Sequence, residues 1–320
     1  MRDTRDMLLV LLSSLLMLTG CSRRDILDDY PVSGVEISLD WNGVTNKLPE
    51  GVRVIFYPKN AEGRKIDTYL SVKGGKVKVP PGRYSVVVYN YDTETVQIRG
   101  EEAYETIEAF TGHCNGLGIA GTEQLVWGPD PLYVVRIDDL KIENSEEELQ
   151  LNWKPKLVVK TYSFKLKVQG LEYVSSIVGS IEGMSSCYDL GLGCGKAGDS
   201  PIYFAARGSA GEVTGSFTVF GTSEGVISRA GNAIKLTLAF VKTDNKVQKM
   251  EVDITEVIAN SESGGSGGDD DGDEPFKEIE LPVEDEVKVD KPDSIGGGDG
   301  GFDGNVDGWG DDEEVILPVN

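Results

Sequence analysis

The sequence predicts an all-β protein with two tandem antiparallel β-sandwich domains and a disordered acidic, glycine-rich C-terminal tail. Three observations support this prediction. Short segments alternate apolar and polar residues, which is the period of a half-buried strand. Turn-forming residues such as proline, glycine and asparagine separate these segments. The region from Pro31 to Asn260, about 230 residues, is too long for one small sandwich, and the composition changes abruptly after it.

The first 20 residues have the pattern of a cleaved lipoprotein signal peptide. Arg2 and Arg5 precede a run of apolar and hydroxyl residues from Met7 to Leu18, which would span only about 18 Å as a helix. This run is too short to cross about 30 Å of hydrocarbon and has the length of a signal-peptide core. The LTGC sequence that ends it resembles a bacterial lipoprotein cleavage box, which predicts removal of residues 1–20 and a lipid on Cys21. The alternative is an ordinary secretory signal that contains a cysteine.

A lipid on Cys21 would attach the mature chain to the outer membrane, because several acyl chains give stable anchoring. Residues 21–30 would then form a short tether. Acidic residues close behind the cysteine resemble the surface-export signals of some bacterial lipoproteins, although Arg23 and Arg24 intervene. We therefore expect an outer-membrane lipoprotein at the cell surface, with the periplasmic face as the alternative.

The first domain is expected over residues 31–155. In VEISLDW, Val35, Ile37 and Leu39 alternate with polar residues, and VRVIFYP continues the pattern as a second strand. In KVKVPPGRYSVVVYN, a Pro-Pro-Gly sequence separates two further strands. Regularly spaced short strands of this kind favour an antiparallel sandwich over βαβ units.

The second domain is expected over residues 156–260, because the proline of the NWKP sequence interrupts the strand pattern. The segment TYSFKLKVQ alternates Tyr162, Phe164 and Leu166 with polar residues. Further strands are expected in SFTVFG, AIKLTLAFV and KMEVDITEVI. Residues 102–110 and 172–183 are the best candidates for helical or loop–helix segments, and the expected helix content is low.

The negative charge is concentrated in the tail, residues 261–320. The whole chain has a formal net charge of −23. The tail holds 20 acidic residues and 3 lysines, a net charge of −17, which leaves −6 for the first 260 residues. A nucleic-acid partner is not expected, because binding nucleic acid requires a basic surface.

Two apolar segments interrupt the tail and are candidates for strand exchange with another protein. Their apolar residues are Ile279, Leu281 and Val283 in the first segment and Val315, Ile316 and Leu317 in the second. Neither segment can bury enough surface by itself to offset the entropy of ordering it, so each is suited to joining the edge of another sheet. Two alternatives remain open, namely a strand that completes this protein's own sheet and an unstructured spacer.

Three cysteines remain if Cys21 carries a lipid: Cys114, Cys187 and Cys194. An odd number in an exported chain allows one disulfide and leaves a free or intermolecular thiol. Cys187 and Cys194 flank a short glycine-rich segment, so they are the predicted pair. Pairings that involve Cys114 remain open.

The sequence indicates no catalytic machinery, and we predict that the protein is not an enzyme. His113 is the only histidine, and it adjoins Cys114, which disfavours a Cys–His dyad. Acidic residues are numerous, but no pair is singled out by its surroundings. We expect no cofactor other than the lipid on Cys21.

One match to a calcium-loop pattern occurs in the tail. Its residues are Asp303, Asn305, Asp307 and Glu314. The glycine-rich segment before it and the β-like segment after it are not the helices that flank such a loop. A tail this rich in glycine and acidic residues generates such a pattern by composition. We therefore expect no metal site, with weak calcium binding as the alternative.

Four parts of the sequence support a family resemblance: VPPGRYSVVVYN, residues 161–186, the late hairpin KLTLAFVKTDNKVQKMEVDITEVI, and the tail around Trp309. Together they resemble the Bacteroidota fimbrial anchor-like lipoproteins, which are related to FimB-type minor subunits of type V pili. The resemblance implies two transthyretin-like, Greek-key sandwiches tethered to the cell surface by the lipid. It also implies that the subunit seats the base of a fimbrium and joins other subunits by strand addition.

The leading functional prediction is therefore a structural anchoring or accessory subunit of a type V-like fimbria or adhesin assembly. Its expected partners are the outer membrane and other fimbrial subunits. The alternative is a glycan-binding surface lipoprotein of a polysaccharide uptake system, which would display exposed aromatic side chains. The candidates for that display are Trp41, Trp127, Trp153 and Trp309.

Overall fold

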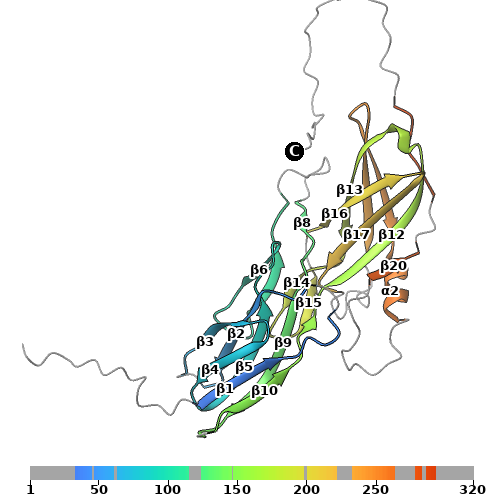
Figure 1. Ribbon diagram of the computed structural model, residues 1–320. Coiled ribbons are helices and arrows are strands. Elements are labelled where there is room, and N and C mark those ends of the chain that lie inside the picture. The colour runs from blue at the N-terminus through green and yellow to red at the C-terminus, as the bar shows by residue number, and fades with distance from the viewer. Residues whose placement is uncertain are drawn as a thin grey trace, which may run out of the picture.

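The computed structural model describes residues 33–44, 47–60, 63–114, 124–145, 147–197, 200–221, 233–263, 278–282 and 286–292. Strands dominate these residues and form two lobes, which lie one beyond the other along the length of the molecule (Figure 1). The predicted all-β fold with tandem sandwiches is confirmed. The predicted signal peptide over residues 1–20 and the tether over residues 21–30 lie outside the described part of the chain.

The first lobe is built on an eight-stranded sheet with the order β10-β1-β4-β3-β2-β5-β9-β11. Its pairings are antiparallel except for β1 with β10, which are parallel. The strands are β1 (Ser33–Leu39), β2 (Gly51–Pro58), β3 (Ile66–Ser71), β4 (Gly74–Val79), β5 (Gly82–Asn90), β9 (Tyr133–Ile142), β10 (Leu149–Trp153) and β11 (Lys156–Leu157).

This sheet closes on itself through one continuous piece of chain. β10 and β11 are the two outermost strands, yet only Lys154 and Pro155 separate them in the sequence. The segment therefore pairs with β1 on one side and with β9 on the other. The alternating residues of the strands point into the enclosed core, which includes Val35, Phe56 and Val86.

A third sheet joins the two halves of the chain. It has the order β15-β14-β7-β6, with β6 (Val96–Arg99) and β7 (Glu108–Thr111) from the first half and β14 (Ser185–Asp189) and β15 (Cys194–Ala197) from the second. It packs on the outer face of β2, β5 and β9, where Ile55 and Val87 meet Ile107 and Ala109. β2, β5 and β9 are thus buried on both faces, which explains the unbroken apolar run in β5.

The second lobe is built on a nine-stranded sheet that contains β19-β18-β13-β16-β17-β12-β20 in that order. Two short strands join it beside this path: β8 pairs with β16, and β21 pairs with β12. The strands are β8 (Val126–Trp127), β12 (Lys160–Gln169), β13 (Val174–Glu182), β16 (Ile202–Ser209), β17 (Glu212–Val219), β18 (Lys235–Lys242), β19 (Val247–Asp253), β20 (Glu278–Leu281) and β21 (Glu286–Lys288).

Helix content is low, but the helices are not where the sequence predicts them. Residues 102–110 form a turn that leads into β7, and residues 172–183 form β13 after a short 3₁₀ turn, Leu171–Tyr173. The helix α2 (Thr255–Ser263) instead follows β19, where the sequence predicts continued strand. No helix in the described ranges is long and apolar enough to cross a membrane.

The predicted domain division lies near the change from one sheet to the next. β11 ends at Leu157 in the first lobe and β12 begins at Lys160 in the second. The third sheet crosses this division, because β14 pairs with β7. The domain boundary at residue 155 therefore stays a prediction. The two halves of the chain on either side of it share the third sheet.

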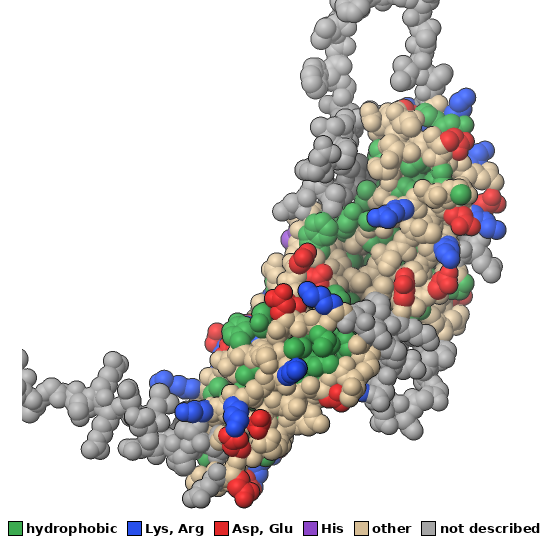
Figure 2. Space-filling view, viewed as in Figure 1, with side chains coloured by type: hydrophobic (Ala, Val, Ile, Leu, Met, Phe, Trp, Pro, Cys, Tyr) green, Lys and Arg blue, Asp and Glu red, His purple; other side chains and the backbone are tan. Residues whose placement is uncertain are grey.

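Acidic and basic side chains are interspersed on the visible face of both lobes, with small groups of hydrophobic side chains between them (Figure 2). This face has no continuous basic area of the kind that nucleic-acid binding requires.

Candidate assembly site

The first predicted tail strand lies on the edge of the second lobe, along β12. β20 pairs with β12 in parallel, with Ile279 opposite Tyr162 and Leu281 opposite Phe164. Leu281 is only 1% exposed and belongs to the core of the second lobe. Ile279 is partly buried against the same core. The tail strand thus contributes apolar surface to its own chain.

The segment then continues along β12 and is held by backbone and side-chain hydrogen bonds. β21 pairs with the end of β12, and Val289 N–H donates to the carbonyl of Gln169 at 2.8 Å. Val289 is 1% exposed and adds a second buried contact beyond Leu281. Gly170 permits this close approach, because a Cβ at that position would lie 2.4 Å from the carbonyl oxygen of Val289.

Gln248 of β19 joins the far edge of the same sheet to this segment. Its Nε2 donates to the carbonyl of Lys288 at 2.9 Å, and its Oε1 accepts from Asp290 N–H at 2.9 Å. β19 and β12 are on opposite sides of the sheet order, so the returning segment lies in the seam between them. We call the described residues 278–282 and 286–292 the closing segment.

The sequence leaves open whether the tail strand pairs within its own chain, and the structure decides this for Ile279 and Leu281. Both lie in the chain's own sheet, so the idea of a strand without a partner at home is wrong for them, and the tail is not disordered over residues 278–282 and 286–292. Their exchange with another protein stays a prediction. The other candidates for exchange, Val283, Val315, Ile316 and Leu317, lie outside the described residues.

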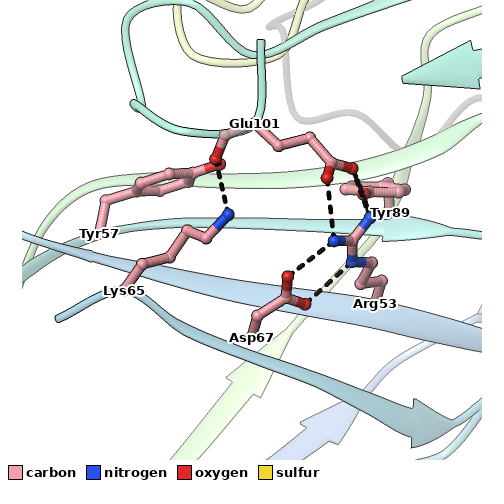
Figure 3. A network of polar contacts seen from close by, with 6 residues as sticks. All are labelled: Arg53, Tyr57, Lys65, Asp67, Tyr89 and Glu101. Atoms are coloured by element: carbon pink, nitrogen blue, oxygen red, sulfur yellow. Dashed lines mark hydrogen bonds and ion pairs between the residues drawn. The ribbon is translucent and has the colours of Figure 1, made fainter. Parts of the chain in front are cut away.

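A network of polar side chains that the sequence did not predict lies on the first lobe (Figure 3). Arg53 of β2 donates to both carboxylate oxygens of Asp67, at 2.9 and 2.7 Å, and also contacts Glu101. The backbone carbonyl of Glu101 accepts from Tyr57 at 3.0 Å and from Lys65 at 2.9 Å. The network therefore holds the turn after β6 on the first sheet.

The charges of this network stabilise one another. The hydrogen bonds that Arg53 donates to Asp67, which outweigh the opposing effect of burial, raise the pKa of Arg53, so the guanidinium stays charged. The hydrogen bond from Arg53 lowers the pKa of Asp67. The Arg53 side chain is 17% exposed, which makes its ion pairs stronger than those on the open surface.

Three comparisons with known proteins place the chain among its relatives. Residues 20–205 match the family described as "Domain of unknown function (DUF5119)". A protein of Bacteroides ovatus described as "Putative fimbrium anchoring subunit Fim4B" is 60% identical, and the match covers 100% of each chain. This chain therefore belongs to the DUF5119 family. The resemblance that we infer from the sequence is therefore confirmed.

Solved structures also match the chain. A crystal structure described as "a putative adhesin from Bacteroides ovatus" is 56% identical and matches with a TM-score of 0.71, over 86% of this chain and 99% of the other. The fimbrial anchor protein Mfa2 from Porphyromonas gingivalis is 12% identical, with a TM-score of 0.48 over 71% of this chain and 84% of its own.

The cysteines of this DUF5119 protein do not form the predicted disulfide. Cys187, Cys194 and Cys114 are all free thiols in the structure. Cys187 lies opposite Lys196 and Cys194 opposite Asp189, so the two cysteines are diagonal neighbours on β14 and β15. Diagonal Cα atoms lie about 7–8 Å apart, which is beyond the usual span of a disulfide. Burial raises the pKa of the Cys114 thiol to about 12.

The predicted aromatic display is also limited in this family member. Trp153 is buried at 9% exposure, and Trp41 is partly buried, with its Nε1 donating to the carbonyl of Val72 at 2.6 Å. Of the tryptophans that the structure describes, Trp127 is the only one classed as exposed, at 37%, and it packs edge-on against Tyr203. Trp309 lies outside the described residues.

Metal-binding groups are not found among the residues that the structure covers. These residues contain no group of three or more His, Cys, Asp and Glu side chains that could hold an ion. The lipidation site Cys21 and the calcium-pattern residues Asp303, Asn305, Asp307 and Glu314 all lie outside them. The lipid on Cys21 and the weak calcium binding both stay predictions.

Proposed function

We propose that the protein is a cell-surface lipoprotein that anchors a fimbrium to the outer membrane. The observation that carries this proposal is the match over the full length of both chains to a relative named as a fimbrium anchoring subunit. The role that this relative's name describes is structural rather than catalytic. The proposal has a membrane end and an assembly end, and each can be tested by itself.

The membrane end is the lipid on Cys21. We expect wild-type protein in the outer-membrane fraction and Cys21→Ala protein in the soluble fraction, because the lipid supplies the attachment. Palmitate labelling should be lost in the same variant. Digestion of intact cells with proteinase K would distinguish the outer surface from the periplasmic face. Unchanged membrane association of Cys21→Ala would overturn lipid anchoring.

The assembly end is the closing segment. β20 is a four-residue parallel strand that lies on an edge of the sheet, so it can leave without breaking the rest of the sheet. Release of this segment would expose both β12 and the apolar side chain of Leu281. We therefore propose that the closing segment exchanges with a strand of another fimbrial subunit.

A disulfide staple tests this exchange directly. Ser163 and Glu280 face each other in the β12–β20 ladder and are not buried. Oxidised Ser163→Cys/Glu280→Cys protein should fail to co-purify with fimbrial subunits from cells, whereas the reduced protein and the Ser163→Cys single variant should succeed. Co-purification with the staple closed would refute exchange of β20.

Two deletions separate the tail segments from each other and from the anchoring role. Removal of residues 275–320 should abolish association with fimbrial subunits, and removal of residues 311–320 tests the segment with Val315, Ile316 and Leu317 alone. Loss with the shorter deletion would assign the exchange to that segment. Fimbrial subunits retained by both deletions would show that assembly uses another surface, and the Cys21 test would be unaffected.

A further inference from the structure

The first lobe displays a cluster of exposed aromatic and apolar side chains around the start of β2. Tyr69 is 60% exposed, Tyr91 is 45% exposed and Leu48 is 42% exposed. The two tyrosine rings pack edge-on with centroids 5.3 Å apart. Large exposed side chains of this kind are concentrated at protein interfaces, where tyrosine and arginine contribute most of the binding energy.

The local backbone is shaped to hold the tyrosine pair in place. Gly51 lies under Tyr91, and a Cβ there would be 2.8 Å from the Tyr91 hydroxyl and 2.7 Å from the carbonyl oxygen of Leu70. Arg53 lies beside the Tyr69 ring, with its guanidinium carbon 5.5 Å from the ring centroid. The tyrosine pair is thus a supported feature of the fold and not a pair of loose surface rings.

The Arg53 network connects this pair to a cleft of about 690 Å³. Glu101 links Arg53 to Tyr57, and the Tyr57 ring packs against Tyr104 with centroids 5.9 Å apart. Tyr57 and Tyr104 both line the cleft. At its rim, Leu192 from the β14–β15 turn is 62% exposed. The surface thus runs from Tyr69 and Tyr91 to Leu192, and we call it the Tyr69–Leu192 surface.

The basic side chains on this surface already have partners. Arg53 is paired with Asp67 and Glu101, and Lys65 donates to the carbonyl of Glu101. Arg136, in the cleft, donates to both oxygens of Asp138 at 2.7 Å. Lys59 lies 3.7 Å from Asp139.

The acidic side chains include several without a basic partner. Glu50 and Asp92 lie next to the tyrosine pair, and Glu50 N–H donates to Asp92 Oδ2 at 2.9 Å. Glu102 and Glu105 line the cleft. No lysine or arginine in the described ranges forms an ion pair with these four carboxylates. The surface therefore carries more negative than positive charge, and a partner can supply the missing positive charge.

We propose that the Tyr69–Leu192 surface docks a basic and apolar segment of another polypeptide. Lysine or arginine side chains of that segment stack on Tyr69 and Tyr91 and pair with Glu50 and Asp92. An aliphatic side chain of the segment packs beside Leu192 at the cleft. This surface is on the first lobe, so it is separate from the closing segment and from the strand exchange proposed above.

Two labelled peptides test the proposal on the full mature chain. One is a fluorescent peptide of alternating arginine and leucine, and the other has glutamate in place of arginine. Fluorescence anisotropy should show saturable binding of the basic peptide only. The Tyr69→Ser/Tyr91→Ser variant should bind it about tenfold more weakly, and Tyr69→Phe/Tyr91→Phe should retain binding, because the rings remain.

A charge-matched control separates binding at this surface from non-specific attraction of the basic peptide to an acidic chain. Glu50→Gln/Asp92→Asn should weaken binding about five- to tenfold. Glu172→Gln/Glu212→Gln removes the same charge from a separate cleft on the second lobe and should change binding less than about twofold. Thermal unfolding of each variant verifies that it is folded.

Four results would overturn the proposal. These are no saturable binding of the basic peptide, equal loss in both carboxylate variants, unchanged binding by the serine variant, and equal binding of the acidic peptide. Binding to a glycan array that is lost in Tyr69→Ser/Tyr91→Ser would assign the surface to a saccharide instead. None of these outcomes depends on Cys21 or on exchange of the closing segment.

Discussion

The two lobes of this protein are closed in different ways. In the first lobe, one continuous segment supplies β10 and β11 and pairs with both edges of the sheet. In the second lobe, the seam is filled by the closing segment, which returns after α2 and residues 264–277. The strands that close the first lobe lie between β9 and β12 in the sequence. The strands that close the second lobe are short and come after all its other strands.

This difference indicates where each lobe can open. Loss of β10 and β11 would expose the core of the first lobe on two sides, so that closure is coupled to the stability of the whole lobe. β20 and β21 form ladder pairs with β12 alone, apart from the side-chain hydrogen bonds of Gln248, and parallel pairing is slightly weaker per residue than antiparallel pairing. We therefore expect local opening of the second lobe without global unfolding.

The largest effect is expected from Phe164→Ala, beneath the closing segment. Phe164 is 1% exposed and packs edge-on against Phe204, so the substitution should cost about 3–5 kcal/mol of unfolding free energy. Hydrogen exchange should rise in β12, β17 and β20, while β1 and β4 stay protected. The matching variant in the first lobe, Phe56→Ala, should give the reverse pattern. Equal loss of protection in both lobes would show that they unfold as one unit.

A smaller effect is expected from Leu281→Ala. The side chain is buried, so the change should cost about 2–3 kcal/mol, at the low end of such substitutions because the segment can detach by itself. Limited proteolysis should cut the variant near residues 278–292 faster than wild type. Ile279→Ala is the matched control, and its partly buried side chain should give a weaker effect. Uniform destabilisation of the second lobe would show that the closing segment is integral to it.

The Arg53 network tests whether the first lobe depends on polar contacts as well. Arg53→Met should cost about 1–2 kcal/mol, because it leaves two partly exposed carboxylates without their partner. Urea unfolding measures the change. Lys76→Met breaks the exposed Lys76–Glu148 pair and should have no measurable effect, so a similar loss in both variants would contradict this role for Arg53.

The smallest effect is a dependence on pH. The hydrogen bond from Arg53 lowers the folded-state pKa of Asp67 below its unfolded value of about 3.9. The stabilisation is therefore present above that unfolded pKa and is lost as the pH falls through the folded pKa. Unfolding free energies measured from pH 6 to pH 3 should fall less steeply in Arg53→Met. Identical slopes would rule out this contribution.

The strands were predictable wherever alternation is undisturbed, as at β1, β4 and β12. The errors at β7 and β13 have a common cause, which is pairing with strands far along the chain. β7 pairs with β14. Val174, Ile177 and Ile181 have helix-like spacing, but residues of β13 pair with β16 and β18, which lie far along the chain. Local periodicity cannot report such pairing. By contrast, α2 begins where Asp253 accepts a hydrogen bond from Thr255 N–H, a capping signal that was present in the sequence.

The assembly site was predictable in part. The apolar alternation at Ile279 and Leu281 predicted a strand, but sequence pattern alone could not decide which sheet it would join. The Arg53 network was not predictable, because its carboxylates lie 14 and 48 residues away in the sequence. Its only signal was a charged residue within the apolar run VRVIFY. Arg53 is partly exposed, between the buried residues Val52 and Val54 of β2.

The position of β1 has a mechanical consequence. Because β1 lies between β10 and β4, it is hydrogen-bonded along both edges. A force applied to the chain before Ser33 therefore enters through an interior strand, which cannot be peeled off as an edge strand can. Extraction of β1 requires two ladders to fail together. The first lobe thus resists pulling at its N-terminal entrance, while the second keeps its removable strand at the other end of the chain.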